Sequence, residues 1–289
     1  MVSNPEDDFN RSGVEGARRA AADFGGEMEY KVAVSPAEEE ALFSEYAASG
    51  RYHLIIAMGG AQTPALLKVA AQYPRQKFAL VDGDVADQPN IVSLHFRDEE
   101  SSFLAGALAS IMSYTGKIGF IGGMDIPAIH RFHAGYSAGA FYVNEDCDVM
   151  ADYTGTWDDA EVGRRLALEQ YGRGADIVFG AAGLSSQGIL AAAAQNDFRA
   201  IGVDSDQRYR APDHVLVSTL KAVDMVVYEV IRKVNEGTFT PGLRSFGLTE
   251  GGVDISLENS LPEVTDEIKQ YINQVRVGII TGAINVPSQ

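Results

Sequence analysis

The chain has 289 residues, a formal net charge of −17 and a hydrophobic content of 46%. This length suits two lobes of roughly 100–150 residues each, and the hydrophobic fraction is ample for two buried cores. The negative charge argues against binding to nucleic acid or to anionic membrane surfaces. The single cysteine, Cys147, excludes an internal disulfide and a cysteine-based zinc cluster. No apolar run approaches the roughly 20 residues that span a bilayer.

The beginning of the chain is unusual for an α/β lobe. The first ten residues contain no signal peptide, and Arg11–Phe24 has apolar side chains near helical spacing. A doubly wound lobe usually opens with a strand before such a helix, and only Met1 to Ser3 remain to supply one. We therefore expect either a short first strand or a chain that begins inside that strand.

Strand-like and helical segments alternate in the first half of the chain. The predicted strands are Lys31–Val34, His53–Met58, Lys77–Asp82 and Asn90–Phe96, and the predicted helices are Pro36–Ser49, Ala61–Tyr73 and Glu99–Met112. The segment Ser113–Gly116 then breaks the pattern and predicts a crossing between lobes.

The second half begins with a predicted strand at Lys117–Gly122 and continues with three apolar runs separated by helical patterns. This spacing is typical of βαβ units, so we expect parallel, buried strands. Two α/β lobes joined by a hinge are the predicted architecture. The three runs are Val149–Tyr153, Asp176–Phe179 and Ala200–Val203, and they are followed by strand Val215–Leu220, helix Lys221–Glu236, strand Gly252–Leu257 and helix Pro262–Val275.

Small clusters of distinctive residues follow the strands of the second half. Trp157 comes after the first of the three runs, Gly180–Gly183 after the second and Asp204 after the third. Ligands of parallel sheets bind outside the carboxyl ends of the strands, and a cleft between lobes is the default ligand site. The sequence therefore predicts a binding site formed by an indole, bare glycine backbone and a carboxylate.

Three patterns resemble enzyme or metal-binding motifs, but the sequence around each does not fit the motif. Gly135–Gly139 matches the G-x-S-x-G pattern of hydrolases, but the residues before it are helical in pattern, which predicts Ser137 in mid-helix among small, closely packed residues. His130 and His133 could share a helix face, yet no third ligand stands at metal-binding spacing. Gly119–Gly123 lacks the spacing of a dinucleotide-binding loop. We expect no enzyme activity, no metal and no cofactor.

Seven short segments follow one another in a characteristic order and spacing over nearly the whole chain. They are Asp8–Asn10, Phe96–Gly106, Gly116–Gly123, Gly155–Asp159, Ala181–Gly183, Gly202–Gln207 and Ser218–Lys221. Each is weak alone, but together they are specific. The chain resembles the basic membrane protein family, the PnrA-like purine nucleoside receptors of ABC transporters.

This resemblance implies a type I periplasmic-binding-protein fold with two doubly wound parallel-sheet lobes and a three-crossing hinge. The first lobe would comprise residues 1–113 and about 222–246, and the second residues 114–221 and about 247–289. A nucleoside such as guanosine, inosine or adenosine would be held in a cleft between the lobes and handed to a membrane permease. The resemblance also implies a monomer in the periplasm or on the cell surface as a lipoprotein, although no signal segment is present in this sequence.

The family's binding residues can be carried over position by position. Phe9 and Trp157 match the two aromatic residues that sandwich the base, where relatives commonly have Phe at the second position. Asp98 would hydrogen-bond the base edge, Asp204 and Lys221 the ribose hydroxyls, and Gly183 would bring bare backbone against the sugar. Asn10 would assist near Phe9.

Some alternatives stay open. Trp157 could pack in the hinge, Asp98 could cap the helix that begins at Glu99, and Asp206 is better explained as a cap than as a ligand contact. An acidic residue that relatives carry eight or nine positions before the Phe9 equivalent has only Met1 at its place. The ligand could instead be another flat molecule, such as a flavin or a free nucleobase. A ligand-responsive sensor of the same fold would need a DNA-binding helix-turn-helix, which the first ten residues do not contain.

Overall fold

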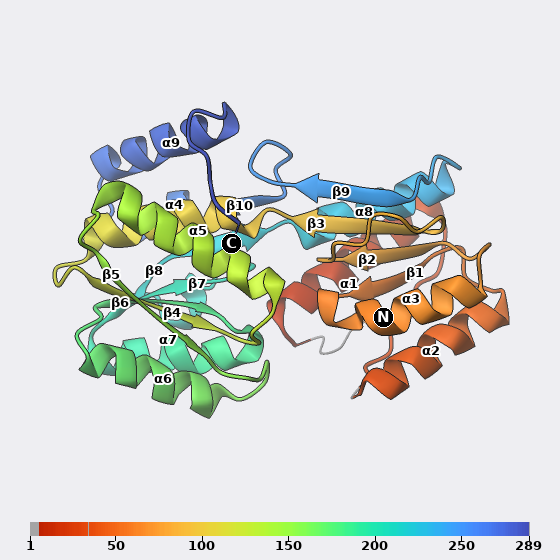
Figure 1. Ribbon diagram of the computed structural model, residues 1–289, viewed down its shortest axis with the longest axis horizontal. Helices are drawn as coiled ribbons and strands as arrows, with labels where there is room; N and C mark the ends of the chain where they lie inside the picture. The colour runs from red at the N-terminus through yellow and green to blue at the C-terminus, as the bar shows by residue number, and fades with distance from the viewer. Residues whose placement is uncertain (1–5, 34, 289) are drawn as a thin grey trace. The chain divides into compact units, whose positions relative to one another are not determined.

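The chain folds into two units of alternating strands and helices (Figure 1), in a computed structural model that describes residues 6–33 and 35–288. The first unit comprises the residues up to Phe96 together with Ala222–Phe246, and the second comprises Arg97–Lys221 and the residues from Gly247 onward. The chain therefore passes from one unit to the other three times, and the type I periplasmic-binding-protein fold is confirmed.

The first unit is built on a parallel sheet. Among the described residues it has four strands in the order β1-β2-β3-β9. β2 is buried along its whole length, as expected for a strand covered on both faces. The strands are β1 (Ile55–Met58), β2 (Phe78–Val81), β3 (Ile91–Phe96) and β9 (Gly242–Phe246).

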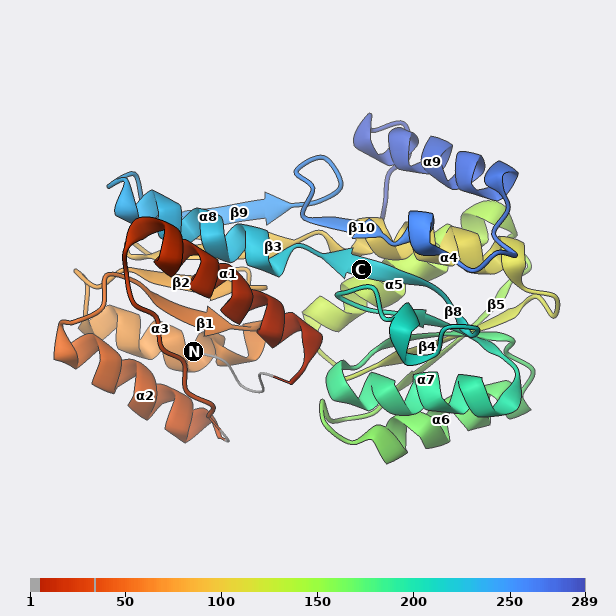
Figure 2. The ribbon, with the colours of Figure 1, turned by 180° about the vertical axis from the view of Figure 1, so that it is seen from behind.

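Helices cover both faces of this sheet. α2 and α3 contribute apolar side chains to a core with β1, β2 and β3, while α1 and α8 pack together on the other face (Figures 1 and 2). α2 begins after the capping hydroxyl of Ser35 and ends at Gly50, whose φ of 63° closes the helix. The helices are α1 (Asp8–Phe24), α2 (Pro36–Ser49), α3 (Thr63–Gln72) and α8 (Val223–Asn235), with a 3-10 turn at Gly60–Gln62.

Three predictions for this unit need comment. Residues 31–33 of the predicted strand Lys31–Val34 form no strand, and Val34 lies outside the described residues. The proposed first strand at Met1–Ser3 also lies outside them. Conversely, β9 (Gly242–Phe246) was not predicted, because its side chains are exposed or half-buried and the segment has little apolar pattern. Its pairing with β3 makes it a strand.

The second unit contains a mixed sheet in the order β10-β8-β7-β6-β4-β5. All pairs are parallel except β10, which runs antiparallel to β8. Because these strands are parallel, the carboxyl ends of β8, β7, β6, β4 and β5 lie at one edge of the sheet. The strands are β4 (Lys117–Gly122), β5 (Asp148–Tyr153), β6 (Ile177–Ala181), β7 (Arg199–Gly202), β8 (Val215–Lys221) and β10 (Val253–Ile255).

The helices of the second unit also form two layers. α6 and α7 pack against one face of the sheet, α4 and α5 lie on the other, and α9 rests on α4 (Figures 1 and 2). These helices are α4 (Asp98–Met112), α5 (Pro127–Val143), α6 (Ala160–Gly172), α7 (Ser186–Asn196) and α9 (Asp266–Ile280), with 3-10 turns at Gly183–Ser185, Arg208–Arg210 and Leu257–Asn259. No helix in the described part of the chain is both long and apolar enough to span a membrane.

The assignment of α4 to the first lobe was wrong. α4 packs on α5 at backbone distance, because a Cβ added at Gly106 would lie 1.9 Å from the Tyr136 carbonyl oxygen, and one at Gly139 would lie 2.0 Å from that of Phe103. This close crossing ties α4 to the second unit. The prediction that Ser137 lies inside a helix is confirmed, because α5 includes it. The G-x-S-x-G pattern is therefore a packing motif and not a nucleophile elbow.

Candidate functional site

The carboxyl edge of the second-unit sheet gathers the predicted site residues of that unit. Lys221 is the last residue of β8, Asp204 follows β7, Gly183 follows β6 and Trp157 follows β5. β8, β7 and β6 are neighbours, and β4 lies between β6 and β5. Residues that are 64 positions apart in sequence, such as Trp157 and Lys221, therefore stand on one edge of one sheet.

Asp98 and Lys221 form a buried ion pair in the second unit. The Lys221 Nζ lies 3.0 Å from Asp98 Oδ1 and 3.2 Å from Oδ2, and the two side chains are only 4% and 1% exposed. Asp98 is the first residue of α4, whose N-cap position is held by Arg97 without a side-chain capping bond. The carboxylate of Asp98 thus pairs with the lysine across the fold instead of capping the helix.

Phe132 of α5 adds an aromatic contact to this pair. Its buried ring lies with the centroid 5.0 Å from Lys221 Nζ, and it packs against Phe179 of β6 at a centroid distance of 6.1 Å. An ammonium group near an aromatic ring is attracted by the ring quadrupole, most strongly when both are desolvated. This contact could not be predicted from the sequence, because one phenylalanine in an apolar helix looks like any core residue.

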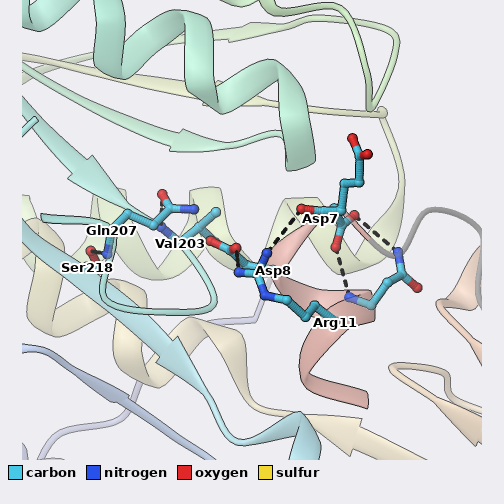
Figure 3. Close-up of polar contacts among 8 residues, drawn as sticks. Asp7, Asp8, Arg11, Val203, Gln207 and Ser218 are labelled. Atoms are coloured by element: carbon cyan, nitrogen blue, oxygen red, sulfur yellow. Dashed lines mark hydrogen bonds and ion pairs between the residues drawn. The ribbon is translucent and has the colours of Figure 1, made fainter. Parts of the chain in front are cut away.

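Asp204 lies in the loop between Val203 and Gln207, and hydrogen bonds of these two residues, drawn in Figure 3, hold the loop in shape. Its φ of +66° is rare for a residue with a side chain, and its carbonyl oxygen accepts from the Lys221 N–H at 2.9 Å. The Gln207 side chain accepts from the Val203 N–H at 3.2 Å, and the Gln207 N–H donates to the Ser218 hydroxyl at 3.0 Å. These bonds hold the loop backbone next to the end of β8, and the Asp204 side chain is half-buried there.

Asp206, two residues further on, has a structural role. Its Oδ1 accepts from the Arg208 N–H at 3.1 Å, at the first residue of a 3-10 turn, and its other oxygen accepts from Asn259. Asp206 is thus a structural residue of this turn, but it is not the predicted cap, because the N-cap position belongs to Gln207.

Trp157 presents its indole at the sheet edge with 38% of the residue exposed. The ring lies against Gly123, where an added Cβ would stand 2.3 Å from Cζ3, and near Gly183, where it would stand 3.6 Å from Cε3. The ring therefore lies above the ends of β4 and β6, although its backbone follows β5. A partly exposed indole that packs on glycine backbone offers a surface on which a flat ligand can stack.

Gly183 has two structural reasons to be glycine. Its φ is +58°, and a Cβ there would lie 3.0 Å from the Trp157 carbonyl oxygen. The structure thus accounts for this glycine through its contact with Trp157. Direct contact between Gly183 and a sugar stays a prediction.

Phe9 and Asn10 lie in the first turn of α1, in the first unit, close in sequence to Asp7, Asp8 and Arg11, which Figure 3 labels. Asp7 caps this helix by accepting from the Asn10 N–H at 2.9 Å and from Asn10 Nδ2 at 3.1 Å, and Asp8 pairs with Arg11. Burial raises the pKa of Asp7, and the hydrogen bonds from Asn10 offset this only in part. The Oδ1 atom of Asn10 is buried and has no hydrogen-bond partner among the described residues, whereas Phe9 is half-buried.

A metal centre has no support in the part of the chain that the structure describes, where no group of three or more His, Cys, Asp or Glu residues could hold an ion. His130 pairs with Asp125, and His133 stacks on Phe120 with ring centroids 5.2 Å apart. Burial lowers the pKa of His133, and the neighbouring His130 lowers it further. These histidines are packed among aromatic rings.

Comparison with known proteins adds independent information. A family model described as "ABC transporter substrate-binding protein PnrA-like" matches residues 6–289. The ABC transporter nucleoside-binding protein BmpA of Lactococcus lactis subsp. cremoris is 38% identical over 256 residues, which cover 82% of this chain and 72% of that protein. An uncharacterized lipoprotein of Pyrococcus abyssi is 36% identical over 259 residues, covering 85% of this chain and 64% of the relative.

A solved structure agrees with these sequence relatives. The solute-binding protein of an ABC transporter system from Aeropyrum pernix K1 is similar to this chain with a TM-score of 0.91 at 31% identity, over 100% of this chain and 91% of that one. The similarity therefore extends over both units and all the elements described above.

Proposed function

We propose that this chain, which belongs to the PnrA-like family of ABC transporter substrate-binding proteins, captures a purine nucleoside for import. The observation that carries the proposal is the combination of an exposed indole, a carboxylate and a buried lysine–carboxylate pair on one sheet edge. The name of the Lactococcus relative, a nucleoside-binding protein, points to the same ligand class.

The indole of Trp157 is suited to the base. Stacking on an aromatic side chain contributes about 1–3 kcal/mol per base, and a purine offers a larger face than a pyrimidine. Two hydrogen bonds fix the loop that carries Trp157. The Trp157 carbonyl accepts from the Ser185 N–H at 3.1 Å, and the Asp159 N–H donates to the Ser185 hydroxyl at 3.0 Å. Phe9 of the first unit is the proposed partner for the other face of the base.

The positions of the polar groups suit the ribose. The indole lies above β4 and β6, while Asp204 follows β7, which is the next strand after β6. Neighbouring strands are about 4.8 Å apart, so the stacking surface and Asp204 are separated by roughly 5–10 Å. A nucleoside that stacks its base on Trp157 can thus direct its ribose hydroxyls toward the Asp204 carboxylate and the Lys221 ammonium.

The Asp98–Lys221 pair supplies both kinds of hydrogen bond in one place. A carboxylate has about four acceptor positions and an ammonium has three donors, so each can bind the other and a ligand group together. We assign Asp98 to the N–H groups of guanine or hypoxanthine and Lys221 to a ribose hydroxyl. Both residues of the pair belong to the second unit, so this part of the proposed site comes from one unit.

The remaining parts of the proposal concern the whole protein. Phe9 and Asn10 would complete the site from the first unit, and the ligand would favour the state in which both units contact it. A permease would accept the loaded form. The lipoprotein name of the Pyrococcus relative favours an extracytoplasmic location with a lipid anchor. We also propose that the receptor acts as a monomer without a cofactor or catalytic activity.

Calorimetric titration with guanosine, inosine, adenosine, uridine and riboflavin tests the proposal, with Trp157 fluorescence followed in parallel. We expect one-to-one binding of a purine nucleoside with a change in emission. Asp204→Asn should weaken binding by about tenfold or more, since a hydrogen bond to a charged group contributes about 1.5–3 kcal/mol. Asp206→Asn is the matched control, because this neighbouring carboxylate is used by Arg208 and Asn259.

Other results would change the assignment. Binding of riboflavin alone would keep the fold and replace the ligand, and equal affinity for inosine and hypoxanthine would remove the role of the ribose. Release of hypoxanthine from inosine would indicate an enzyme. If the folded, ligand-free protein bound none of these compounds, the nucleoside proposal would be wrong.

A further inference from the structure

Gly123 follows β4 at the carboxyl edge of the second-unit sheet, and it lies directly under the indole of Trp157. A Cβ added to Gly123 would stand 2.3 Å from Cζ3, 2.5 Å from Cε3 and 3.1 Å from Cη2 of the indole. All three atoms belong to the six-membered ring. Distances under 3 Å are not tolerated between carbon atoms, so any side chain at this position must displace the ring.

The backbone at Gly123 does not itself require glycine. Gly123 is absent from the residues with positive φ, which include Gly155 and Gly183 nearby. Its conformation is therefore open to alanine, and the missing side chain matters only for the space it leaves. This separates Gly123 from Gly183, where substitution would also strain the backbone.

Hydrogen bonds hold the backbone on both sides of this contact. The Gly123 N–H donates to the Ala181 carbonyl at 3.0 Å, and its own carbonyl accepts from the Gly155 N–H at 2.9 Å, which fixes the glycine between β6 and the Trp157 loop. Within that loop the Thr154 hydroxyl donates to the Thr156 carbonyl at 2.6 Å. A displaced indole would therefore rotate about its side-chain bonds, outward from the sheet edge.

We propose that Gly123 is a positioning residue for nucleoside recognition, because its missing side chain sets the depth at which the indole of Trp157 lies. This inference rests on the proposed function and extends it to a residue outside the predicted site. Gly123 and Trp157 form a matched pair. A phenyl ring at position 157 lacks the indole's second ring, so it reaches less far over Gly123 and leaves more room for a side chain there.

A double-mutant cycle tests this pairing with Gly123→Ala, Trp157→Phe and the double variant. Gly172→Ala is the matched control, because the Cβ of this glycine in the same unit would have no atom within 4 Å. Affinity for inosine and guanosine is measured by calorimetry, and folding by thermal unfolding. Trp157 is the only tryptophan, so emission and quenching of the ligand-free protein report the ring position directly.

We expect Gly123→Ala to weaken binding about tenfold in the Trp157 protein, and only about twofold in the Trp157→Phe background. In Gly123→Ala the wavelength of maximum Trp157 emission should shift, and the indole should become more accessible to a quencher. Gly172→Ala should match the parent in emission and affinity. If Gly123→Ala does not fold, the same pairing predicts that the double variant does.

Three outcomes would overturn the inference. They are unchanged emission and affinity in Gly123→Ala, an equal loss of affinity in both backgrounds, and a double variant that unfolds as readily as Gly123→Ala. Failure of the proposed function is seen separately, as a parent protein that binds no nucleoside. In that case emission of Gly123→Ala still shows whether the glycine positions the ring.

Discussion

Replacing Lys221 with methionine would leave a carboxylate buried without its cation. The ammonium lies 3.0 and 3.2 Å from the two oxygens of Asp98, and both side chains are almost completely removed from solvent. Methionine fills a similar volume, and it keeps a contact with the ring of Phe132, which lies 5.0 Å from the ammonium. The substitution therefore removes charge and hydrogen bonds with little change in packing.

The size of the effect follows from the burial. Breaking one partner of a buried ion pair costs about 3–5 kcal/mol, whereas replacing both partners by apolar groups of similar volume is often close to neutral. We expect Lys221→Met to destabilise the second unit by about 3–5 kcal/mol, and Asp98→Leu combined with Lys221→Met to cost clearly less than the sum of the single changes. Both single variants should lose nucleoside binding.

Urea unfolding followed by Trp157 fluorescence is the suitable assay. Two units can unfold separately, and Trp157 reports only on the second, which contains the pair. Lys117→Met is the control, because Lys117 is an exposed lysine at the start of β4 in the same unit, and it should change stability by less than about 0.5 kcal/mol. The reasoning is refuted if Lys221→Met costs no more than Lys117→Met, or if the two changes at the pair are additive.

Three further predictions concern packing and ionisation. Gly106→Ala should destabilise the second unit by about 1–3 kcal/mol in the same urea assay, because the new Cβ meets the Tyr136 carbonyl at 1.9 Å; an unchanged midpoint would contradict the close crossing of α4 and α5. Burial raises the pKa of the Cys147 thiol, so at mildly alkaline pH a disulfide reagent should label the folded protein far more slowly than the urea-unfolded protein, and equal rates would be inconsistent with burial. Burial acts to raise the pKa of Glu250, but hydrogen bonds from a backbone N–H and from Arg97 lower it overall. Its stabilising contribution is thus present at neutral pH and lost as the pH falls below the usual 4.5, so the melting temperature of Glu250→Gln should depend less on pH in this range than that of the parent.

Much of the fold follows from local sequence. The helix Pro36–Ser49 and the strand Lys117–Gly122 were predicted with the bounds that the structure shows. The helix is delimited by a capping serine before it and a glycine after it, and the strand by a glycine turn and a dense apolar run. Such signals act within a few residues, so they can be read without knowing what the segment packs against.

Pairing over long distances could not be read in this way. β9 (Gly242–Phe246) has alternating half-buried and exposed residues and becomes a strand only beside β3, while residues 31–33 have a strand-like composition but form none. The position of α4 also depends on its partner, because the glycines that let it cross α5 at backbone distance lie on both helices. Whether such a segment forms a strand, and where such a helix packs, depends on the free energy of the whole packed unit.

Local sequence was enough to predict that Trp157, Gly183 and Asp204 follow successive strands and thus share one sheet edge, whereas Lys221 was expected at the start of a helix and is the last residue of β8. What each of these residues contacts depends on how distant parts of the chain pack together. Asp98 and Lys221 are 123 positions apart and form an ion pair because α4 crosses the end of β8. Trp157 lies on Gly123 because β5 is next to β4. Such contacts depend on strand order and helix crossing, and those depend on packing among residues distant in the chain.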